Sequence, residues 1–427
     1  MLEFSQDEYR IGGVSALTLS EKYETPLYVY DAKKMETQYK QLCKAFSKTK
    51  MKVHYACKAL TNISVLKFFK SLGAGLDTVS IEEVRLGLLA GFEPSDILFT
   101  PNSVALSEIN EAVNLGVQVN IDSISVLEEF GHQWGGKVPV CVRINPHLMA
   151  GGNAKISVGH IDSKFGISLY QMRHVMRIVD AYKMKITGLH MHTGSDILDV
   201  EVFLRGLDIL LETAEEFPDL EYIDMGSGFK VAYKENDITT DIDRLGEQVS
   251  ERFNEFCKQY GKDLTLVFEP GKYLVSESGT FLASVSVLKT TPTAVFAGLN
   301  SGMNHLIRPM FYEAYHHITN ISNPTGVPRV YNVVGYICET DTFGANRKLS
   351  DIRENDVLAF QNAGAYSFMM SSNYNSRFRP AEVLVYEGKD YLIRKRETFE
   401  DITRNQIEMD FSKISVSNDK KNKEVVS

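Results

Sequence analysis

The run "KVHYACKAL" (residues 52–60) alternates apolar side chains like a buried strand and then ends on a lysine. At such a point the ammonium group of Lys58 must be hidden, paired or uncharged. A lysine desolvated by its neighbours has a lowered pKa, which makes its amine a nucleophile suited to forming an imine with a carbonyl compound. A purely structural ion pair of Lys58 with Asp77 or Glu83 explains the same pattern equally well.

Further polar residues stand at or just beyond the ends of other short apolar runs. They are Asp77, Asp122, Arg143, Asn145, His190, His192, Gly226, Gly228 and Glu269. Any one of them alone is more simply an ordinary cap or a satisfied buried polar group. Because these residues stand at the ends of seven of the eight apolar runs, the pattern favours one shared site.

Three short motifs indicate what such a site can bind. "DMGSGF" (224–229) offers consecutive small residues whose backbone N–H groups can approach an anion, "HTGS" (192–195) offers an imidazole face and a hydroxyl, and "FEPGK" (268–272) carries a carboxylate on a turn. Glycine-rich turns and structural histidines are common, so each motif alone is a weak signal. Downstream, "CETDTF" places Cys338 beside Glu339. Most buried cysteines, however, only pack in a core and are unreactive.

The elements that must position these groups follow from the rhythm of the sequence. Between residues 50 and 271 eight short apolar runs alternate with amphipathic segments such as "TNISVLKFFKSL" and "SIEEVRLGLLA". The runs are "KVHYAC", "GAGLDTV", "DILFT", "VQVNID", "PVCVRIN", "ITGLHMH", "YIDMGSG" and "LTLVFEPG". Eight strands with interposed helices predict an α/β protein built on a (β/α)₈ TIM barrel, whose reacting groups gather at the C-terminal ends of the strands.

After Gly271 the rhythm changes to β-rich runs separated by Gly, Pro and Asn turns, which predicts a second, all-β domain. The strand-like "PLYVY" (26–30) precedes the barrel and can add a strand to the barrel or to this β domain. The expected division is a cofactor-binding barrel at 31–271, a β domain from 1–30 plus 272–412, and a disordered polar tail at 413–427.

The composition of the 427-residue chain excludes several classes of protein. The net charge of −9 leaves no basic block for phosphates, so nucleic acid is not an expected partner. Five scattered cysteines form no CxxC pair and no zinc-type spacing, which suggests neither a metal site nor a disulfide framework. The acidic opening lacks a signal peptide, and no apolar run reaches the length of a membrane span. We therefore expect a cytoplasmic protein.

Taken in order, the motifs resemble the pyridoxal-phosphate decarboxylases of the alanine-racemase-like fold, and among them the diaminopimelate decarboxylases. The resemblance covers nearly the whole chain. It is carried by "YACKAL", "SKFGI", "GLHMHTGS", "DMGSGF", "EPGK", "MNHLIRPMFYEAYH" (303–316), "CETD" and "SNYNSRFRPAEVL". Several motifs in the same order are far more specific than any one of them.

The resemblance implies pyridoxal 5'-phosphate as cofactor and a role for each matching residue. Lys58 would hold the cofactor covalently and exchange with the substrate amine, while the ring of His192 would stack on the cofactor and Glu269 would bond its pyridine nitrogen. The remaining implied cofactor contacts are Asp77, Ser195, Gly226, Ser227, Gly228, Gly271, Lys272 and Tyr366. A carboxylate at the nitrogen favours decarboxylation, since racemases of this fold carry arginine there.

The resemblance also implies how the substrate is bound and protonated. Cys338 would protonate the α-carbon after CO₂ leaves, and it would do so in the active site of a neighbouring subunit, which implies a homodimer with shared active sites. Arg308 and Tyr312 match positions that grip the distal carboxylate of diaminopimelate, and an arginine fork suits that task. Lys272, Glu339 and Tyr366 would complete the substrate contacts.

The chain departs from the family pattern at three points. Lys272 stands where arginine is usual, Ser227 replaces the middle glycine of a triple, and the glycine usual between the positions of Thr340 and Asp341 is missing. Lysine is a point charge without the fork of arginine, so the grip at Lys272 is expected to differ, and so is the setting of the Cys338 loop.

The leading hypothesis is decarboxylation of meso-2,6-diaminopimelate to L-lysine and CO₂, the last step of lysine biosynthesis. The alternatives are a sister decarboxylase of another amino-acid or polyamine precursor, such as carboxynorspermidine, and a barrel that binds the cofactor without catalysis.

Overall fold

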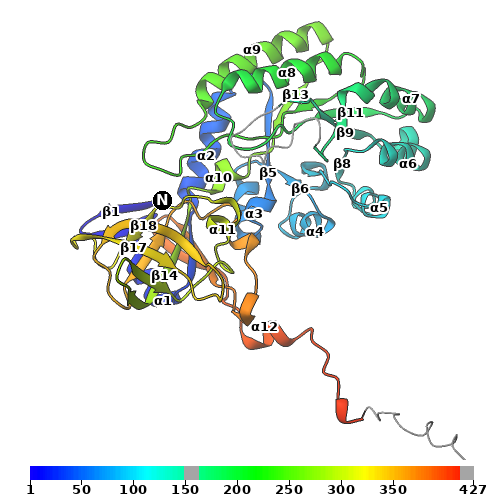
Figure 1. Ribbon diagram of the computed structural model, residues 1–427. Helices are drawn as coiled ribbons and strands as arrows, with labels where there is room; N and C mark the ends of the chain where they lie inside the picture. The colour runs from blue at the N-terminus through cyan, green and yellow to red at the C-terminus, as the bar shows by residue number, and fades with distance from the viewer. Residues whose placement is uncertain (149–162, 414–427) are drawn as a thin grey trace, which may run out of the picture.

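The computed structural model describes residues 1–148 and 163–413, and its larger part is a closed parallel barrel (Figure 1). The strands pair in the order β9-β11-β12-β13-β5-β6-β7-β8, and a pairing of β8 with β9 closes the ring. They are β5 (Met51–Ala56), β6 (Gly75–Thr78), β7 (Ile97–Phe99), β8 (Gln118–Ile121), β9 (Val140–Asn145), β11 (Ile186–His190), β12 (Tyr222–Asp224) and β13 (Thr265–Phe268). Each predicted apolar run contains one of these strands, which confirms the predicted barrel.

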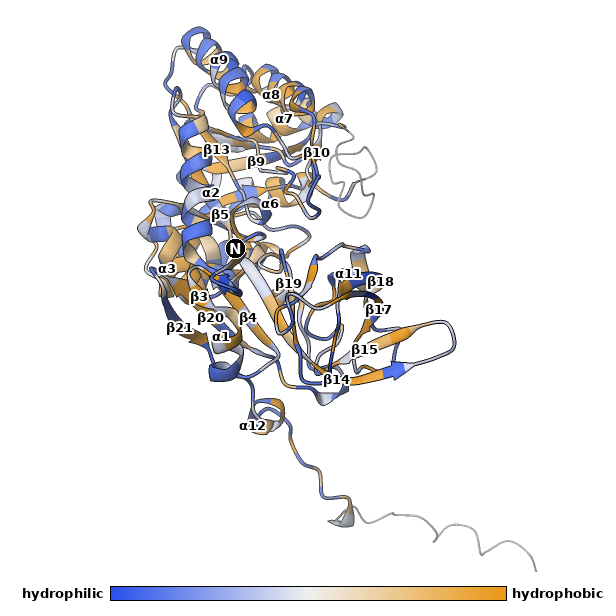
Figure 2. Ribbon diagram, turned by 90° about the vertical axis from the view of Figure 1, so that its left-hand side faces the viewer, coloured by the Kyte–Doolittle hydropathy of each residue, from blue (hydrophilic) through white to orange (hydrophobic). Residues whose placement is uncertain are grey.

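Amphipathic helices cover the outside of the barrel. They are α2 (Ala32–Ala45), α3 (Ile63–Ser71), α4 (Ile81–Leu89), α5 (Leu106–Asn114), α6 (Ile124–Trp134), α7 (Met172–Tyr182), α8 (Val200–Ala214) and α9 (Ile242–Tyr260). Hydrophilic and hydrophobic residues alternate along α8 and α9 in Figure 2, as expected for helices with one face on a sheet. Several begin at a capping side chain; for example, the Ser80 hydroxyl accepts a hydrogen bond from the Glu83 N–H at the start of α4.

Polar side chains gather inside the barrel. They can do so because successive side chains of a strand point to opposite faces, so one set faces the helices and the other faces the interior. In β5, Tyr55 points outward and stacks on Phe69 of α3, so the neighbouring positions 54 and 56 point inward. The parallel ladders then place Arg143 of β9 beside His190 of β11, and His190 beside Asp224 of β12. Register therefore brings three polar groups, distant in sequence, to one level of the barrel.

The second part of the fold is a β-rich sheet beside the mouth of the barrel (Figure 1). Its strands pair in the order β18-β17-β15-β14-β4-β20-β21, and of two further strands β19 pairs with β14 and β16 pairs with β19. Their bounds are β4 (Leu27–Asp31), β14 (Gly279–Thr290), β15 (Val295–Leu299), β16 (Ile318–Asn320), β17 (Pro328–Val334), β18 (Thr342–Ser350), β19 (Val357–Phe360), β20 (Ala381–Tyr386) and β21 (Lys389–Arg394). The predicted all-β part is confirmed.

The strand predicted at "PLYVY" belongs to this second sheet. β4 pairs antiparallel with β14 and parallel with β20, so the alternative that it joins the barrel is wrong. All five residues of β4 are buried. This burial fits the position of β4 in the centre of the second sheet, between β14 and β20.

Smaller elements complete the fold. They are β1 (Leu2–Ser5), β2 (Glu8–Ile11) and β3 (Val14–Ser15), which form a three-stranded sheet, then β10 (Ile167–Ser168), which pairs in parallel with the end of β9, and the helices α1 (Ala16–Tyr23), α10 (Lys272–Val275), α11 (Arg308–Tyr312) and α12 (Phe399–Thr403). The tail predicted at 413–427 lies outside the described residues except for Lys413, which ends a 3₁₀ turn. Within residues 1–148 and 163–413, no helix combines the length and apolarity needed to cross a membrane.

Candidate active site

A cavity of about 790 Å³ opens at the C-terminal ends of the barrel strands, where barrels of this type carry their active sites. Loops of the barrel form most of its wall, and Arg308, Tyr312 and Tyr366 from the β-rich part close it. Twelve of the predicted site residues line it: Lys58, Asp77, His192, Ser195, Ser227, Gly228, Glu269, Gly271, Lys272, Arg308, Tyr312 and Tyr366. The structure thus brings together groups spread over most of the chain.

Lys58 lies in a short 3₁₀ turn (Cys57–Ala59) directly after β5, and its side chain is exposed to the cavity. The carbonyl of Ala59 accepts a 2.9 Å hydrogen bond from the backbone N–H of Tyr366, which has the left-handed φ of +54°. A strained tyrosine held in this way indicates a functional position. The β-rich part therefore fixes the turn that carries the lysine.

The prediction that the pKa of Lys58 is lowered is wrong. Burial of the ammonium group lowers the pKa of Lys58. The electrostatic effects of Asp77, Tyr366 and Glu269 are together larger, so the pKa of Lys58 is raised above its ordinary value. The structural alternative also finds no support, because within the described residues no carboxylate lies at salt-bridge distance from Lys58. Burial and the neighbouring charge of Glu269 in turn raise the pKa of Asp77 to about 8.

The glycine-rich turn after β12 packs directly under His192. The Ser227 N–H donates a 3.2 Å hydrogen bond to His192 Nδ1, so this nitrogen carries no proton, and burial lowers the pKa of the ring. Gly226 has φ +62°, and a Cβ there would lie 2.7 Å from His192 Nδ1 and from the carbonyl oxygen of Met191. A Cβ at Gly228, with φ +126°, would lie 2.6 Å from the Gly194 carbonyl oxygen. Neither position tolerates a side chain. The backbone of this turn can therefore pack closely against His192 and the Gly194 carbonyl.

Gly226→Ala is expected to weaken cofactor binding about tenfold and to lower stability by about 2 kcal/mol, from left-handed strain plus the contact with His192. Gly388→Ala is the matched control, because Gly388 has a similar φ of +71° and open space around its missing Cβ. Cofactor titration and thermal unfolding of both variants measure the difference. Equal cofactor affinities would contradict a role of this turn as a cradle.

Two of the cationic side chains that line the cavity, Lys272 and Arg308, have different surroundings. Lys272 Nζ lies 2.6 Å from Asp196 Oδ1, so its charge is already paired. Arg308 is buried, donates a 3.0 Å hydrogen bond to the Tyr233 hydroxyl and lies 5.6 Å from the ring centres of Tyr233 and Tyr312. Its Nε has no partner within the described residues. Of these two cations, Arg308 is the one that forms no ion pair with a carboxylate of the described residues.

Three predicted residues stand apart from this lining. Gly226 lies behind it, under His192. Cys338 is exposed, with its sulfur 3.3 Å from Asn375 Nδ2, and Glu339 is exposed and accepts a hydrogen bond of 3.1 Å from the Tyr374 hydroxyl. Cys338 is therefore not inert filling of a core. Neither Cys338 nor Glu339 is among the described residues that line the cavity.

Sequence patterns gave no role to several residues that the structure places at the site. Tyr233 and Asp196 contact Arg308 and Lys272, but their partners are set by tertiary structure and no local motif announces them. Asp224 opens the motif "DMGSGF", but the sequence pattern predicts a binding role only for the small residues of this motif. The even spacing of inward-pointing positions, 222, 224 and 226, is the signal that could have found it.

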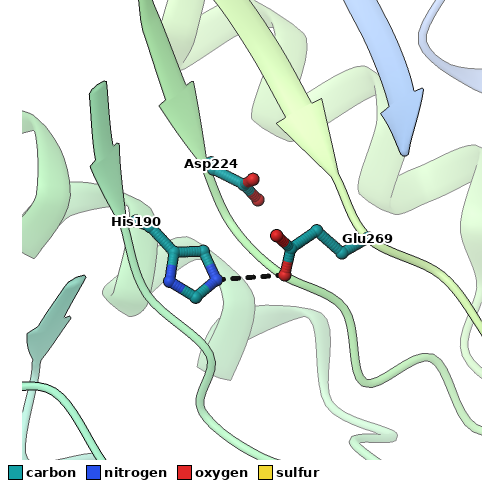
Figure 3. Close-up of side chains that lie close together, drawn as sticks. All are labelled: His190, Asp224 and Glu269. Atoms are coloured by element: carbon teal, nitrogen blue, oxygen red, sulfur yellow. Dashed lines mark hydrogen bonds and ion pairs between the residues drawn. The ribbon is translucent and has the colours of Figure 1, made fainter. Parts of the chain in front are cut away.

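His190, Asp224 and Glu269 form a compact buried cluster at the base of the cavity (Figure 3). One ligand-type atom from each lies within 4.8 Å of the others, which is close enough for a metal ion. We interpret the cluster as a hydrogen-bonded set, because His190 Nε2 already lies 3.1 Å from Glu269 Oε2.

Residues 32–276 match the pattern of the family described as "Pyridoxal-dependent decarboxylase, pyridoxal binding domain". This chain belongs to that family. It is 38% identical to a diaminopimelate decarboxylase of Methanothermobacter thermautotrophicus, over 93% of this chain and 95% of that protein. Among solved structures, the diaminopimelate decarboxylase of M. jannaschii aligns with a TM-score of 0.87 at 31% identity, covering 96% of this chain and 98% of that chain.

A second solved structure is similar to this chain in the same way. It is the diaminopimelate decarboxylase of Helicobacter pylori complexed with L-lysine, with a TM-score of 0.83 and 31% identity, covering 91% of this chain and 98% of that chain. A lysine/ornithine decarboxylase from Vibrio vulnificus, at 22% identity and a TM-score of 0.75, shares the fold.

The cavity of this pyridoxal-dependent decarboxylase fits pyridoxal 5'-phosphate. Lys58 offers an amine to the aldehyde, and the turn around Gly228 offers backbone N–H groups to the phosphate. Glu269 Oε1 is buried without a partner within the described residues, so an acceptor for a protonated ring nitrogen is available. The types of group and their placement agree with what the cofactor requires.

Proposed function

We propose that this protein decarboxylates meso-2,6-diaminopimelate to L-lysine and CO₂ with pyridoxal 5'-phosphate as cofactor. The single observation that carries the proposal is that the Lys58 amine, the Glu269 carboxylate and the Arg308 guanidinium line one cavity of a pyridoxal-dependent decarboxylase. The relatives named diaminopimelate decarboxylase, which match over nearly the whole chain, support the same reaction.

The bound cofactor supplies an electron sink for the charge left on carbon when CO₂ departs. Lys58 would hold it covalently and would move protons at the substrate amine, while the neutral ring of His192 would pack against its face. The phosphate is bound by the Ser227 to Gly228 turn with Ser195. Glu269 would accept a hydrogen bond from the protonated ring nitrogen and would thereby keep the ring cationic.

The substrate is selected at the opposite side of the cavity. Arg308 binds the distal carboxylate, because a guanidinium fork held between two tyrosine rings is already oriented for a bidentate contact. Tyr312 and Tyr366 pack against the rest of the substrate chain. Lys272 contributes charge only by rearranging its contact with Asp196.

We also propose that the active unit is a homodimer whose active sites are shared. Cys338 and Glu339 are exposed and lie outside the lining of their own cavity, which supports their use by a second copy of the chain. The partner subunit's Cys338 then delivers a proton to the substrate α-carbon, and the partner subunit's Glu339 holds the distal ammonium group.

The test of the reaction is CO₂ release from a panel of amino acids. Diaminopimelate is expected to be decarboxylated, whereas ornithine, arginine, lysine and carboxynorspermidine are not. The distal carboxylate is the group that separates the first substrate from ornithine, arginine and lysine. Turnover of carboxynorspermidine alone would identify a sister decarboxylase, and absence of turnover despite a bound cofactor would identify a non-catalytic binder.

Arg308→Lys is expected to raise the KM for diaminopimelate about tenfold, and Arg308→Gln about 100-fold, because a charged, bidentate contact is weakened or lost. Arg347→Lys is the matched control: Arg347 also lies over a tyrosine ring, 4.1 Å from the ring centre of Tyr315, but it does not line the cavity. Steady-state kinetics of the three variants measure the effect. An unchanged KM in Arg308→Gln would remove Arg308 from the substrate site.

We further propose the division of the chain into a barrel domain at 31–271 and a β domain formed by 1–30 and 272–412. The pairing of β4 with β14 and β20 supports the first boundary, and the end of β13 at Phe268 supports the second. All five cysteines are free thiols, which suits a reducing compartment such as the cytoplasm.

A further inference from the structure

We propose that His190 and Asp224 are positioning residues that hold Glu269 as an oriented carboxylate facing the cofactor. This inference rests on the proposed function, in which Glu269 is the acceptor for the ring nitrogen. Both are buried polar residues that lie close to Glu269, and they come from the adjacent strands β11 and β12 (Figure 3).

The first support comes from His190. Its Nε2 lies 3.1 Å from Glu269 Oε2, and the side chains of the two residues are 1% and 7% exposed. Burial lowers the pKa of His190, so the ring is neutral and has a single N–H. That proton belongs on Nε2, since Nδ1 has no partner within the described residues and Glu269 can only accept. His190 therefore donates to one oxygen of the carboxylate.

The second support comes from Asp224, which is fully buried and lies above the His190–Glu269 pair in Figure 3, on the strand between β11 and β13. Its Oδ1 accepts a 2.8 Å hydrogen bond from the Gly226 N–H. Its Oδ2 and Glu269 Oε1 both lack a donor within the described residues. Burial and the charge of Glu269 raise the pKa of Asp224 well above its usual range, which favours the protonated form that can donate to Glu269. Because each carboxylate oxygen has two lone pairs, Glu269 Oε1 can accept from Asp224 and still accept from a ring nitrogen.

The carboxylate that results is fixed from several directions. Although burial favours its neutral form, His190 and Lys58 hold the pKa of Glu269 below its ordinary value. The Glu269 N–H also donates a 2.6 Å hydrogen bond to the Gly226 carbonyl, so Asp224 and Glu269 both bind the same turn. The phosphate-binding turn and the group that faces the ring nitrogen are thereby built as one unit.

Pairs of variants at each position test this arrangement. Asp224→Asn keeps a donor toward Glu269, whereas Asp224→Leu removes it, and His190→Gln keeps a donor that His190→Phe removes. The Leu and Phe variants are expected to bind pyridoxal 5'-phosphate about tenfold more weakly and to lose about tenfold in kcat at saturating cofactor. The Asn and Gln variants are expected to stay within about threefold of the parent protein for both quantities.

His54→Gln is the matched control. His54 is a second buried histidine inside the barrel, on β5, and it contacts neither Glu269 nor the cavity. It is expected to leave cofactor affinity unchanged even if it lowers the melting temperature. Thermal unfolding of every variant separates loss of the fold from loss of the site.

Two outcomes would overturn the inference. If Asp224→Asn fails as badly as Asp224→Leu, Asp224 does not act as a donor to Glu269; if His190→Phe binds cofactor like the parent, His190 does not orient it. Cofactor affinity and the visible absorption spectrum are read without any substrate. The inference can therefore fail while diaminopimelate is still decarboxylated, and it can hold even if the substrate proves to be another amino acid.

Discussion

Lys58→Ala is expected to abolish the visible absorption of the covalently bound cofactor and to lower the rate of decarboxylation by about 10³-fold or more. Two other lysines line the cavity, but Lys272 is paired with Asp196 and Lys234 Nζ lies over the ring of Tyr315, 5.2 Å from its centre, so neither is expected to replace Lys58. Absorption spectra and CO₂ release measure both effects. After borohydride reduction, peptide mapping by mass spectrometry is expected to place the label on Lys58 in the parent protein.

Lys52→Ala is the control for this experiment. Lys52 lies on the same strand, β5, but near the opposite end, where it forms an ion pair of 2.6 Å with Asp96. Its loss is expected to leave both the colour and the rate intact. A label on another side chain, or an unchanged rate in Lys58→Ala, would defeat the assigned chemistry.

Cys338→Ala is expected to bind the cofactor like the parent protein and to lose about 100-fold or more in rate, because the proton donor to the α-carbon is removed. Cys257→Ala, on α9 and far from the cavity lining, is the matched cysteine control. Equal rates in Cys338→Ala and the parent would reject its role as the acid.

Mixing the two inactive variants tests the shared active site. In a mixed dimer of Lys58→Ala and Cys338→Ala, one site lacks both groups, while the other combines an intact Lys58 with the partner's Cys338. Random exchange of subunits is then expected to restore about a quarter of the parental activity. No recovery, with mixed dimers demonstrated by size and tag, would place both groups in the same subunit.

The sequence was sufficient for the architecture because each apolar run is a local signal. The eight strands of the closed barrel each follow from a run of five to eight residues, and the interposed helices follow from their amphipathic spacing. The place of β4 was not determined in this way. A strand buried on both faces looks the same whichever sheet receives it, and only pairing with β14 and β20 decides between them.

The candidate site was predictable where a residue type at a strand end carries its own meaning, as Lys58 and Glu269 do. The raised pKa of Lys58 was not, because it depends on Asp77 and Glu269, which come from two other strands. The contact of Tyr233 with Arg308 likewise joins the barrel to the β-rich part across a long sequence separation. Such charges and contacts exist only once the register of the barrel is set.

The central position of β4 affects how the chain is made. Residues 27–31 leave the ribosome first among the strands of their sheet, but their neighbours β14 and β20 are synthesised only after the whole barrel. A nascent chain therefore carries a largely apolar, unpaired strand while the barrel folds, and such a strand is prone to associate with other chains. Removal of the N-terminal or the C-terminal part of the chain breaks this sheet, so the sheet forms only when both parts belong to one chain.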